Sequence, residues 1–155
     1  MSYLDYLKDR PSRYKINKLF EYMRVLEEGC NGNIELSVEP ETLDTEVDEA
    51  NDDFEREVTI SLEDGEGNLH QWFNGEVDVD IADDSTDGEA QFEDGTTDTQ
   101  QLKLERGGEA TITIVYDTSS GDFEAGDEIT VTVSSDNILG YSIDDATSID
   151  TLAAE

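Results

Sequence analysis

The most concentrated set of possible metal ligands lies in the segment that begins at Asp83. Asp83, Ser85, Asp87, Gly88 and Asp94 follow the spacing of a calcium-binding loop, in which oxygen ligands alternate and a glycine allows a sharp turn. The match is partial, because Ser and Asp stand where such a loop prefers Asp or Asn and Glu, and no helical pattern flanks the segment. We therefore interpret the segment first as a hydrated turn and retain Asp83, Ser85, Asp87 and Asp94 as weak candidates for holding a cation.

Apart from carboxylates, residues suited to catalysis are scarce. His70 is the single histidine and Cys30 the single cysteine, so neither a nucleophile with an adjacent base nor a zinc cluster is predicted. In a chain with 41 Asp and Glu residues, a pair of carboxylates at catalytic spacing has no diagnostic value. We expect a protein that is not an enzyme and that uses no cofactor beyond nonspecific or weakly specific cations.

The acidic balance is the strongest signal in the composition. Nine Lys and Arg residues oppose 41 Asp and Glu residues, which gives a net charge of −32 in 155 residues. At physiological salt the Debye length is roughly 8 Å and such a surface repels itself, whereas near 1 M salt it falls to about 3 Å and the repulsion is largely screened. We infer adaptation to high salt. The same charge argues against nucleic acid as a direct partner, because phosphate binding requires clustered Lys and Arg.

Apolar and polar residues alternate in several short segments between residues 57 and 134. A period of two places the apolar residues on one face of a strand, and clusters of Gly, Asp, Asn and Ser separate the segments as turns. This pattern predicts a mainly β protein with an immunoglobulin-like β-sandwich. The alternating sets are Val58, Ile60 and Leu62; Val77, Val79 and Ile81; Ala110, Ile112, Ile114 and Tyr116; and Ile129, Val131 and Val133.

The N-terminal segment has a helical pattern. Its apolar side chains recur at the spacing of one helix face and stop before Gly29. Six cations and five acids fall in the first 28 residues, so this segment carries 6 − 5 = +1 and the remainder 3 − 36 = −33. Two interpretations remain: the helix lies on its own sandwich, or it docks onto a partner or another copy through apolar and Arg side chains. The residues we predict for docking are Tyr14, Ile16, Leu19, Phe20, Met23, Arg24 and Leu26.

These patterns divide the chain into three parts. Residues 1–38 form a helical docking segment and a first strand, residues 39–57 an acidic solvated linker, and residues 58–152 the sandwich. The N-terminus has no apolar run of signal-peptide length, and no stretch is long enough to span a membrane. We therefore expect synthesis in the cytoplasm, no signal peptide and no membrane partner.

Several pieces of the sequence also carry a family resemblance. Their order resembles bacterial immunoglobulin-like domains, and the combination of a strand ending in HQWFNG, a Gly-Glu-Ala-Thr strand, an Ala-Gly-Asp turn and a final ILGY is similar to immunoglobulin-like accessory proteins of tailed-virus virions. The resemblance covers the last two thirds of the chain. The pieces are VTISLEDGEGNLHQWFNGEVDVDIAD from Val58, a Gly-Thr-Thr turn, QLKLERGGEATITIV from Gln101 and AGDEITVTVSSDNILGY from Ala125.

The resemblance implies a structural virion protein of a haloarchaeal tailed virus, as a capsid decoration, turret or head-associated component. Its expected location is the virion, and its expected partners are other virion proteins such as a capsid protein, together with further copies in a homo-oligomer. The alternative is a module that binds glycans or a cell surface, because immunoglobulin-like domains serve many roles. Such a module would use Trp72, Phe73, Tyr116 or Tyr141 as a stacking platform.

Overall fold

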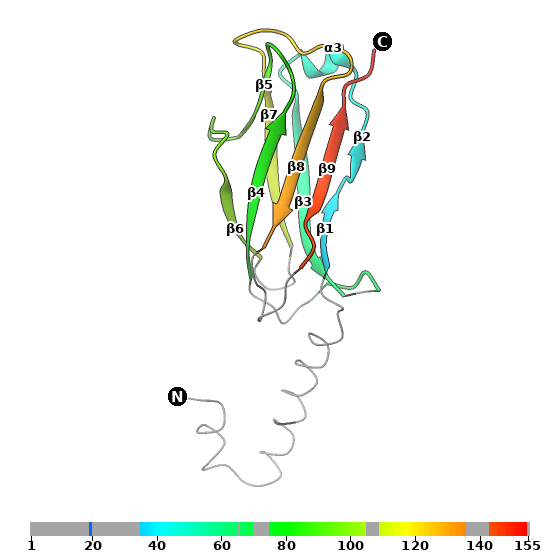
Figure 1. Cartoon of the computed structure of the whole chain (residues 1–155), viewed down its shortest axis with the longest axis vertical. Helices are drawn as coiled ribbons and strands as arrows, with labels where there is room; N and C mark the ends of the chain where they lie inside the picture. The colour runs from blue at the N-terminus through cyan, green and yellow to red at the C-terminus, as the bar shows by residue number, and fades with distance from the viewer. Residues whose placement is uncertain are drawn as a thin grey trace. The chain divides into compact units, whose positions relative to one another are not determined.

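The computed structural model describes Leu19 and residues 35–64, 66–69, 75–104, 109–135 and 143–154. The chain divides into two compact units, residues 1–33 and residues 34–155, and every described residue except Leu19 belongs to the second unit. The strands of this second unit form two sheets (Figure 1). The predicted immunoglobulin-like sandwich is confirmed, and the N-terminal helix predicted to precede it lies outside the described residues.

One sheet has four strands, all antiparallel to their neighbours. Its order is β1 (Glu35–Glu39), β3 (Glu55–Glu63), β7 (Glu109–Asp117) and β5 (Glu89–Phe92). Strand β3 lies between β1 and β7, and its alternating residues Val58 and Ile60 pair with Ile112 and Ala110 of β7. The alternation in the sequence therefore predicts the inward faces of β3 and β7 correctly.

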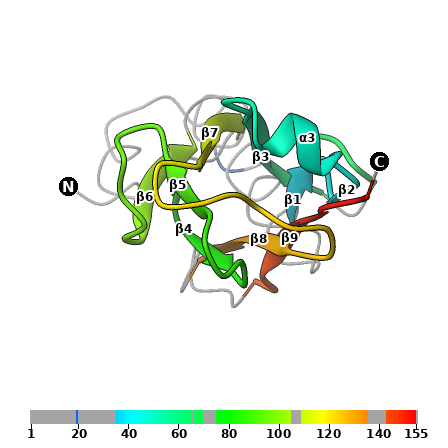
Figure 2. The ribbon, with the colours of Figure 1, turned by 90° about the horizontal axis from the view of Figure 1, so that it is seen from above.

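The other sheet has five strands. Its order is β2 (Thr42–Leu43), β9 (Ala146–Thr151), β8 (Glu128–Ser134), β4 (Gly75–Asp83) and β6 (Gln100–Leu104). Strand β2 runs parallel to β9, and the other pairs are antiparallel. Viewed from above, the two sheets form separate layers (Figure 2).

The hydrophobic core lies between the sheets. Each of the four alternating sets predicted from the sequence contributes at least two fully or nearly fully buried side chains. Burying one such aliphatic side chain contributes roughly 1.5–3 kcal/mol, so these sets account for much of the drive to form the sandwich. The largest buried side chains include Tyr116, Phe92, Phe123, Ile60 and Leu62.

Residues 39–57 belong to the sandwich, which corrects the prediction of a solvated linker. The chain leaves β1 at Glu39 and joins the other sheet as β2, so one segment borders both sheets. It then forms the short helix α3 (Val47–Ala50) and enters β3. Thr45 and Ala50 are buried in this segment. The prediction was wrong because the apolar residues of this segment that pack on the core, Val47, Ala50 and Phe54, are scattered and do not alternate.

Candidate functional site

Most of the residues predicted for docking lie outside the part of the chain that the structure describes. They are Tyr14, Ile16, Phe20, Met23, Arg24 and Leu26. Leu19 is described, and its residue surface is 43% exposed. An exposed leucine at this position is compatible with a docking face, although the face as a whole stays a prediction.

The outward faces of the sandwich carry carboxylates where the inward faces carry aliphatic side chains. On β4, Glu76, Asp78 and Asp80 alternate with the buried Val77 and Val79. The sequence assigns only three of its nine cations to residues 34–155. The sandwich therefore presents a strongly anionic surface, and such a surface is most stable where salt screens it.

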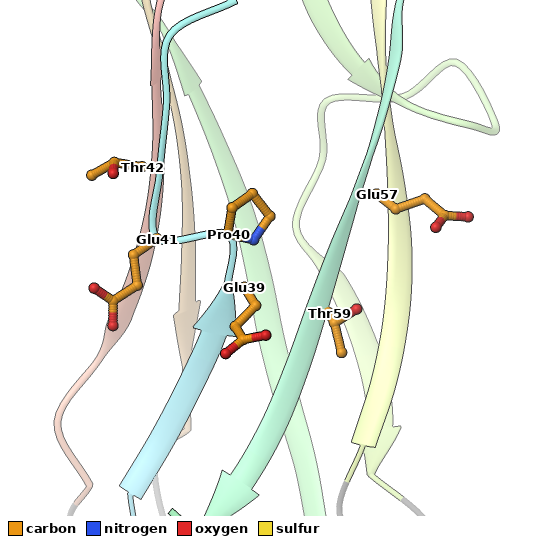
Figure 3. A pocket seen from close by; sticks show the side chains of 6 residues that line it. All are labelled: Glu39, Pro40, Glu41, Thr42, Glu57 and Thr59. Atoms are coloured by element: carbon orange, nitrogen blue, oxygen red, sulfur yellow. The ribbon is translucent and has the colours of Figure 1, made fainter.

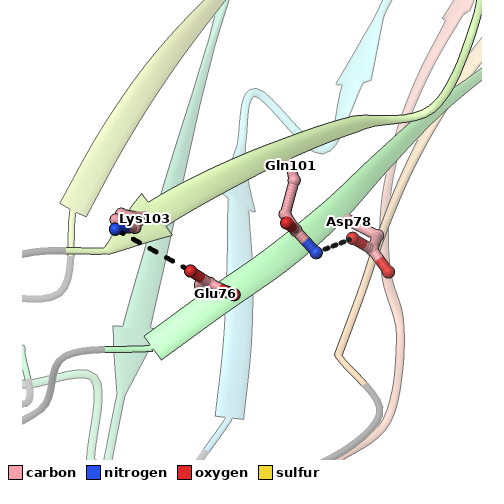
Figure 4. Close-up of polar contacts among 4 residues, drawn as sticks. All are labelled: Glu76, Asp78, Gln101 and Lys103. Atoms are coloured by element: carbon pink, nitrogen blue, oxygen red, sulfur yellow. Dashed lines mark hydrogen bonds and ion pairs between the residues drawn. The ribbon is translucent and has the colours of Figure 1, made fainter.

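Polar pairs connect β4 to β6 on this surface (Figure 4). Lys103 Nζ lies 3.9 Å from Glu76 Oε1, with the two side chains 71% and 55% exposed. Gln101 Nε2 donates a hydrogen bond of 3.3 Å to Asp78 Oδ1. An exposed ion pair of this kind contributes about 0–1 kcal/mol. These pairs therefore affect the charge pattern of the edge more than the stability of the fold.

A buried carboxylate, Asp150, joins three parts of the sandwich. It is fully buried on the inward face of β9. Its Oδ1 accepts a hydrogen bond of 3.1 Å from the Thr45 backbone N–H, and its Oδ2 accepts one of 2.7 Å from the Thr45 hydroxyl. The Tyr116 hydroxyl of β7 also donates to Oδ2, at 2.5 Å. Asp150 therefore connects the segment after β2 with both sheets.

Arg56 is the buried cation of the same interior region. It lies on the inward face of β3 and is 4% exposed. Its Nη2 donates long hydrogen bonds to the carbonyl oxygens of Ile129 and Ser148, at 3.5 and 3.4 Å, in the opposite sheet. Its Nε and Nη1 are buried and have no hydrogen-bond partner among the residues that the structure describes. Leaving such donors unsatisfied costs free energy. Arg56 is therefore a structural residue of the core whose burial lowers the stability of the fold.

Tyr116 is part of this buried region and does not belong to a ligand-stacking surface. It is 2% exposed, and its ring contacts those of Phe54 and Phe123 at centroid distances of 5.2 and 5.3 Å. Burial raises the pKa of the phenol well above its usual 10.0, and the hydrogen bond to Asp150 acts in the same direction. The structure therefore corrects the inclusion of Tyr116 in a stacking platform, whereas Trp72, Phe73 and Tyr141 lie outside the described residues.

Of the four weak cation candidates, Asp83 and Ser85 share one turn, and Asp94 lies in another. Asp83 Oδ1 accepts a hydrogen bond from the Ser85 backbone N–H and Oδ2 one from the Ala90 backbone N–H, at 2.8 and 2.7 Å. Asp94, beyond β5, accepts both donors of Thr96 in a turn of its own. No group of three or more His, Cys, Asp or Glu side chains among the described residues is arranged to hold a metal ion. These carboxylates therefore bind nearby protein donors, as turn residues do.

A surface hollow of about 690 Å³ lies where the chain crosses from one sheet to the other (Figure 3). Its lining residues are Glu39, Pro40, Glu41, Thr42, Glu57 and Thr59. Three of these carry carboxylates and none is cationic. In Figure 3 the Glu57 side chain points away from those of Glu39 and Glu41. The hollow would repel an anionic ligand and brings no convergent set of groups to one point.

Comparison with known proteins identifies the fold. The structure is similar to the crystal structure of the apo-form Calx CBD1 domain, with a TM-score of 0.52 and 14% sequence identity over 79% of this chain and 98% of that chain. At this identity the similarity shows the fold alone. No protein-family model and no curated protein sequence matches the chain.

Two other solved structures overlap less well. One is a conjugative transposon lipoprotein from Bacteroides eggerthii, with a TM-score of 0.38 and 16% identity over 74% of this chain and 95% of that chain. The other is a PapD-like domain of human CEP192, with a TM-score of 0.39 and 10% identity over 80% of this chain and 86% of that chain. With TM-scores below 0.5, neither adds to the argument.

No described helix has the length and apolar character needed to cross a membrane.

The interior polar region was not predicted from the sequence, because the pattern of β9 does not show which of its faces is inward. In β9 the inward positions are Ser148 and Asp150, while Ile149 between them is partly exposed. A strand with polar residues at successive inward positions indicates a buried hydrogen-bonded cluster in place of an aliphatic face.

Proposed function

We propose that the chain is a non-enzymatic structural protein of a virion, adapted to high salt and attached through its N-terminal segment. In this proposal the particle belongs to a haloarchaeal tailed virus, and the sandwich projects from it as a decoration, turret or head-associated component. The anionic surface of the sandwich is the observation that carries the proposal. A surface with so few cations repels itself least in concentrated salt, where the charge is screened, and it offers no electrostatic attraction for phosphate or for an anionic membrane.

The contrast between the two units supports attachment through the first. Residues 1–28 carry +1 while the rest of the chain carries −33. A nearly neutral segment with aromatic and aliphatic residues meets less repulsion on approaching an acidic surface, such as another copy of the sandwich, than any face of the sandwich would. Leu19, which is 43% exposed, represents this segment among the described residues.

The experiment compares two exposed leucines in the full-length chain. Leu19 and Leu69 are 43% and 39% exposed, so each replacement by Glu adds one charge without opening a core. Tagged wild type, Leu19→Glu and Leu69→Glu would be expressed in an infected halophilic host, and the particles purified in concentrated salt and analysed by mass spectrometry. We expect wild type and Leu69→Glu in the particles, and loss of Leu19→Glu from them.

Two results would overturn the proposal. The first is a wild-type chain that stays in the soluble fraction and never sediments with particles. The second is equal incorporation of all three proteins, which would place the attachment away from the face that contains Leu19. Circular dichroism of the purified variants verifies that each sandwich is folded.

The alternative function is a module that binds glycans or a cell surface. With Tyr116 buried, this alternative depends on Trp72, Phe73 and Tyr141. Binding of the purified full-length chain to host envelope glycans, abolished by Trp72→Ala and absent from particle fractions, would favour it over the virion role.

A further inference from the structure

The sandwich has four sheet edges, formed by β1 and β5 in one sheet and by β2 and β6 in the other. An edge strand presents unpaired backbone N–H and C=O groups, and these are a template for another strand. Among the described residues, no strand pairs with the outer side of β6 (Figure 1). The question is which of the four edges a second strand can approach.

Three of the edges are protected. Strand β1 has exposed glutamates at both ends, Glu35 and Glu39. Strand β2 has only two residues. Strand β5 has four residues and begins with the exposed Glu89, and the backbone N–H of Phe92 at its end already donates to the Thr96 carbonyl. Short length and charge are the usual means by which edges avoid pairing.

Strand β6 differs in its charge. Its sequence QQLKL contains none of the 41 acidic residues of the chain. Gln101 and Lys103 are its exposed residues, while Leu102 between them is partly buried against the core. A lysine on an edge strand normally opposes pairing between copies. On a unit with 36 acids and three cations, Lys103 instead lowers the repulsion between two copies.

We propose that a second copy of this chain pairs with β6, antiparallel, about a two-fold axis at Leu102. Residues directly opposite each other in an antiparallel pair share a face. Gln101 would therefore lie opposite the partner's Lys103, and Leu102 opposite the partner's Leu102. No carboxylate of β6 meets another, whereas an axis at Lys103 would bring two ammonium groups together. The two five-stranded sheets then become one continuous sheet.

This contact is small and forms between two chains of charge −32. Its strength should therefore depend on screening, and we expect the dimer to be favoured as salt rises from about 0.1 M to about 1 M. The proposal does not depend on the virion role, since it concerns the purified chain alone.

The test uses two opposite changes at one exposed residue. Gln101→Lys places a cation opposite the partner's Lys103, and Gln101→Glu places a carboxylate there, twice in each dimer by symmetry. From the usual energies of cross-strand pairs, we expect the dissociation constant to rise with Gln101→Lys and to fall with Gln101→Glu, each on the order of 2- to 30-fold. Sedimentation velocity of the full-length proteins at about 1 M KCl measures this.

The signs separate this contact from other effects. Within one chain Gln101 faces Asp78, so Gln101→Lys should stabilise the monomer and Gln101→Glu destabilise it, opposite to their effects on dimerisation. If net charge alone governed association, Gln101→Lys would promote it. Thr147→Lys and Thr147→Glu, at an exposed position of β9 inside the same sheet, are the controls and should leave the dissociation constant within about twofold, as expected for a site outside the contact.

The outcomes are decisive for β6. A dimer that responds in opposite directions to the two Gln101 variants supports the proposal. A chain that stays monomeric at high salt overturns it. A dimer that ignores both Gln101 variants overturns it as well, because its contact then lies elsewhere, including the segment before residue 34.

Discussion

The Tyr116 hydroxyl donates to the Asp150 carboxylate at 2.5 Å, across the space between the two sheets. Both residues are buried, so this hydrogen bond forms where water does not compete for either partner. The same carboxylate accepts two hydrogen bonds from Thr45. Asp150 therefore holds Thr45, which lies where the chain passes from β2 of one sheet towards β3 of the other.

Replacing Asp150 with Asn should destabilise the fold strongly. The amide has the shape of the carboxylate but offers one acceptor oxygen, so it cannot accept from the Thr45 N–H at one atom and from the two hydroxyls at the other. We expect a loss of about 1.5–3 kcal/mol, typical of a buried charge-assisted hydrogen bond. Urea unfolding in concentrated KCl measures the change.

The control for this substitution is Asp80→Asn. Asp80 accepts a hydrogen bond from Thr99 on the exposed face of β4, and a surface change of this kind should stay within about 0.5 kcal/mol. Equal effects of the two substitutions would show that Asp150 has no special role.

Tyr116 should make the stability of the fold sensitive to alkaline pH. Burial raises the folded-state pKa of its phenol above the ordinary 10.0, so above pH 10 the unfolded chain releases this proton while the folded chain retains it. The contribution of Tyr116 to the free energy of unfolding is fully present below pH 10.0 and is lost as the pH rises from there towards the folded-state pKa of its phenol. The loss should amount to about 1.4 kcal/mol for each pH unit in that range.

Comparison with Tyr116→Phe isolates the effect. The variant lacks the hydrogen bond to Asp150 and should be less stable at neutral pH, by about 1–3 kcal/mol. The variant has no phenol to ionise, and other effects of alkaline pH are common to both proteins. The difference in their free energies of unfolding should therefore shrink above pH 10. Urea unfolding measures this difference, and a constant value up to about pH 11 would show that ionisation of Tyr116 does not cause the loss of stability.

The sequence predicted the parts of the sandwich that depend on local alternation. Val58, Ile60 and Leu62 follow a period of two and are fully buried. The interior polar cluster is different, because Thr45 and Asp150 are 105 residues apart and neither is unusual in its own segment. Arg56, between two glutamates, also reads as a surface residue although it is 4% exposed. Such positions depend on long-range partners that a sequence pattern does not reveal.

Gly88 leaves space for the ring of Phe123. A Cβ atom at residue 88 would lie 2.8 Å from three ring carbons of Phe123. The ring has little freedom to move, because it is buried and packs against the Tyr116 ring, and the Phe123 backbone is held by two hydrogen bonds with the Asn51 side chain, at 2.7 and 3.0 Å. We expect Gly88→Ala to cost about 1–3 kcal/mol, as overpacking of a core does, measured by urea unfolding.

A second background makes this prediction specific. In a Phe123→Leu chain the ring is absent, and Gly88→Ala should then cost much less than in the wild type. Gly95→Ala serves as the control because no described residue lies within 4 Å of its Cβ position, and its positive φ of 78° is the same in both backgrounds. If Gly88→Ala had the same cost in both backgrounds, contact with the ring would not be its cause.

The anionic surface should make folding depend on salt through screening. We expect the melting temperature to rise strongly between about 0.1 M and 1 M KCl, as the Debye length falls from about 10 Å to about 3 Å.

Glu76, Asp78 and Asp80 lie on alternate, outward positions of β4. The triple variant Glu76→Gln, Asp78→Asn and Asp80→Asn removes three of these charges without touching the core. It should therefore melt at a higher temperature than the wild type in low salt and gain less from added KCl. If added KCl raised the melting temperatures of the triple variant and the wild type equally, screening of the surface charge would not be the cause. The stabilisation would then come from a bound cation or from a general effect of the salt on apolar burial.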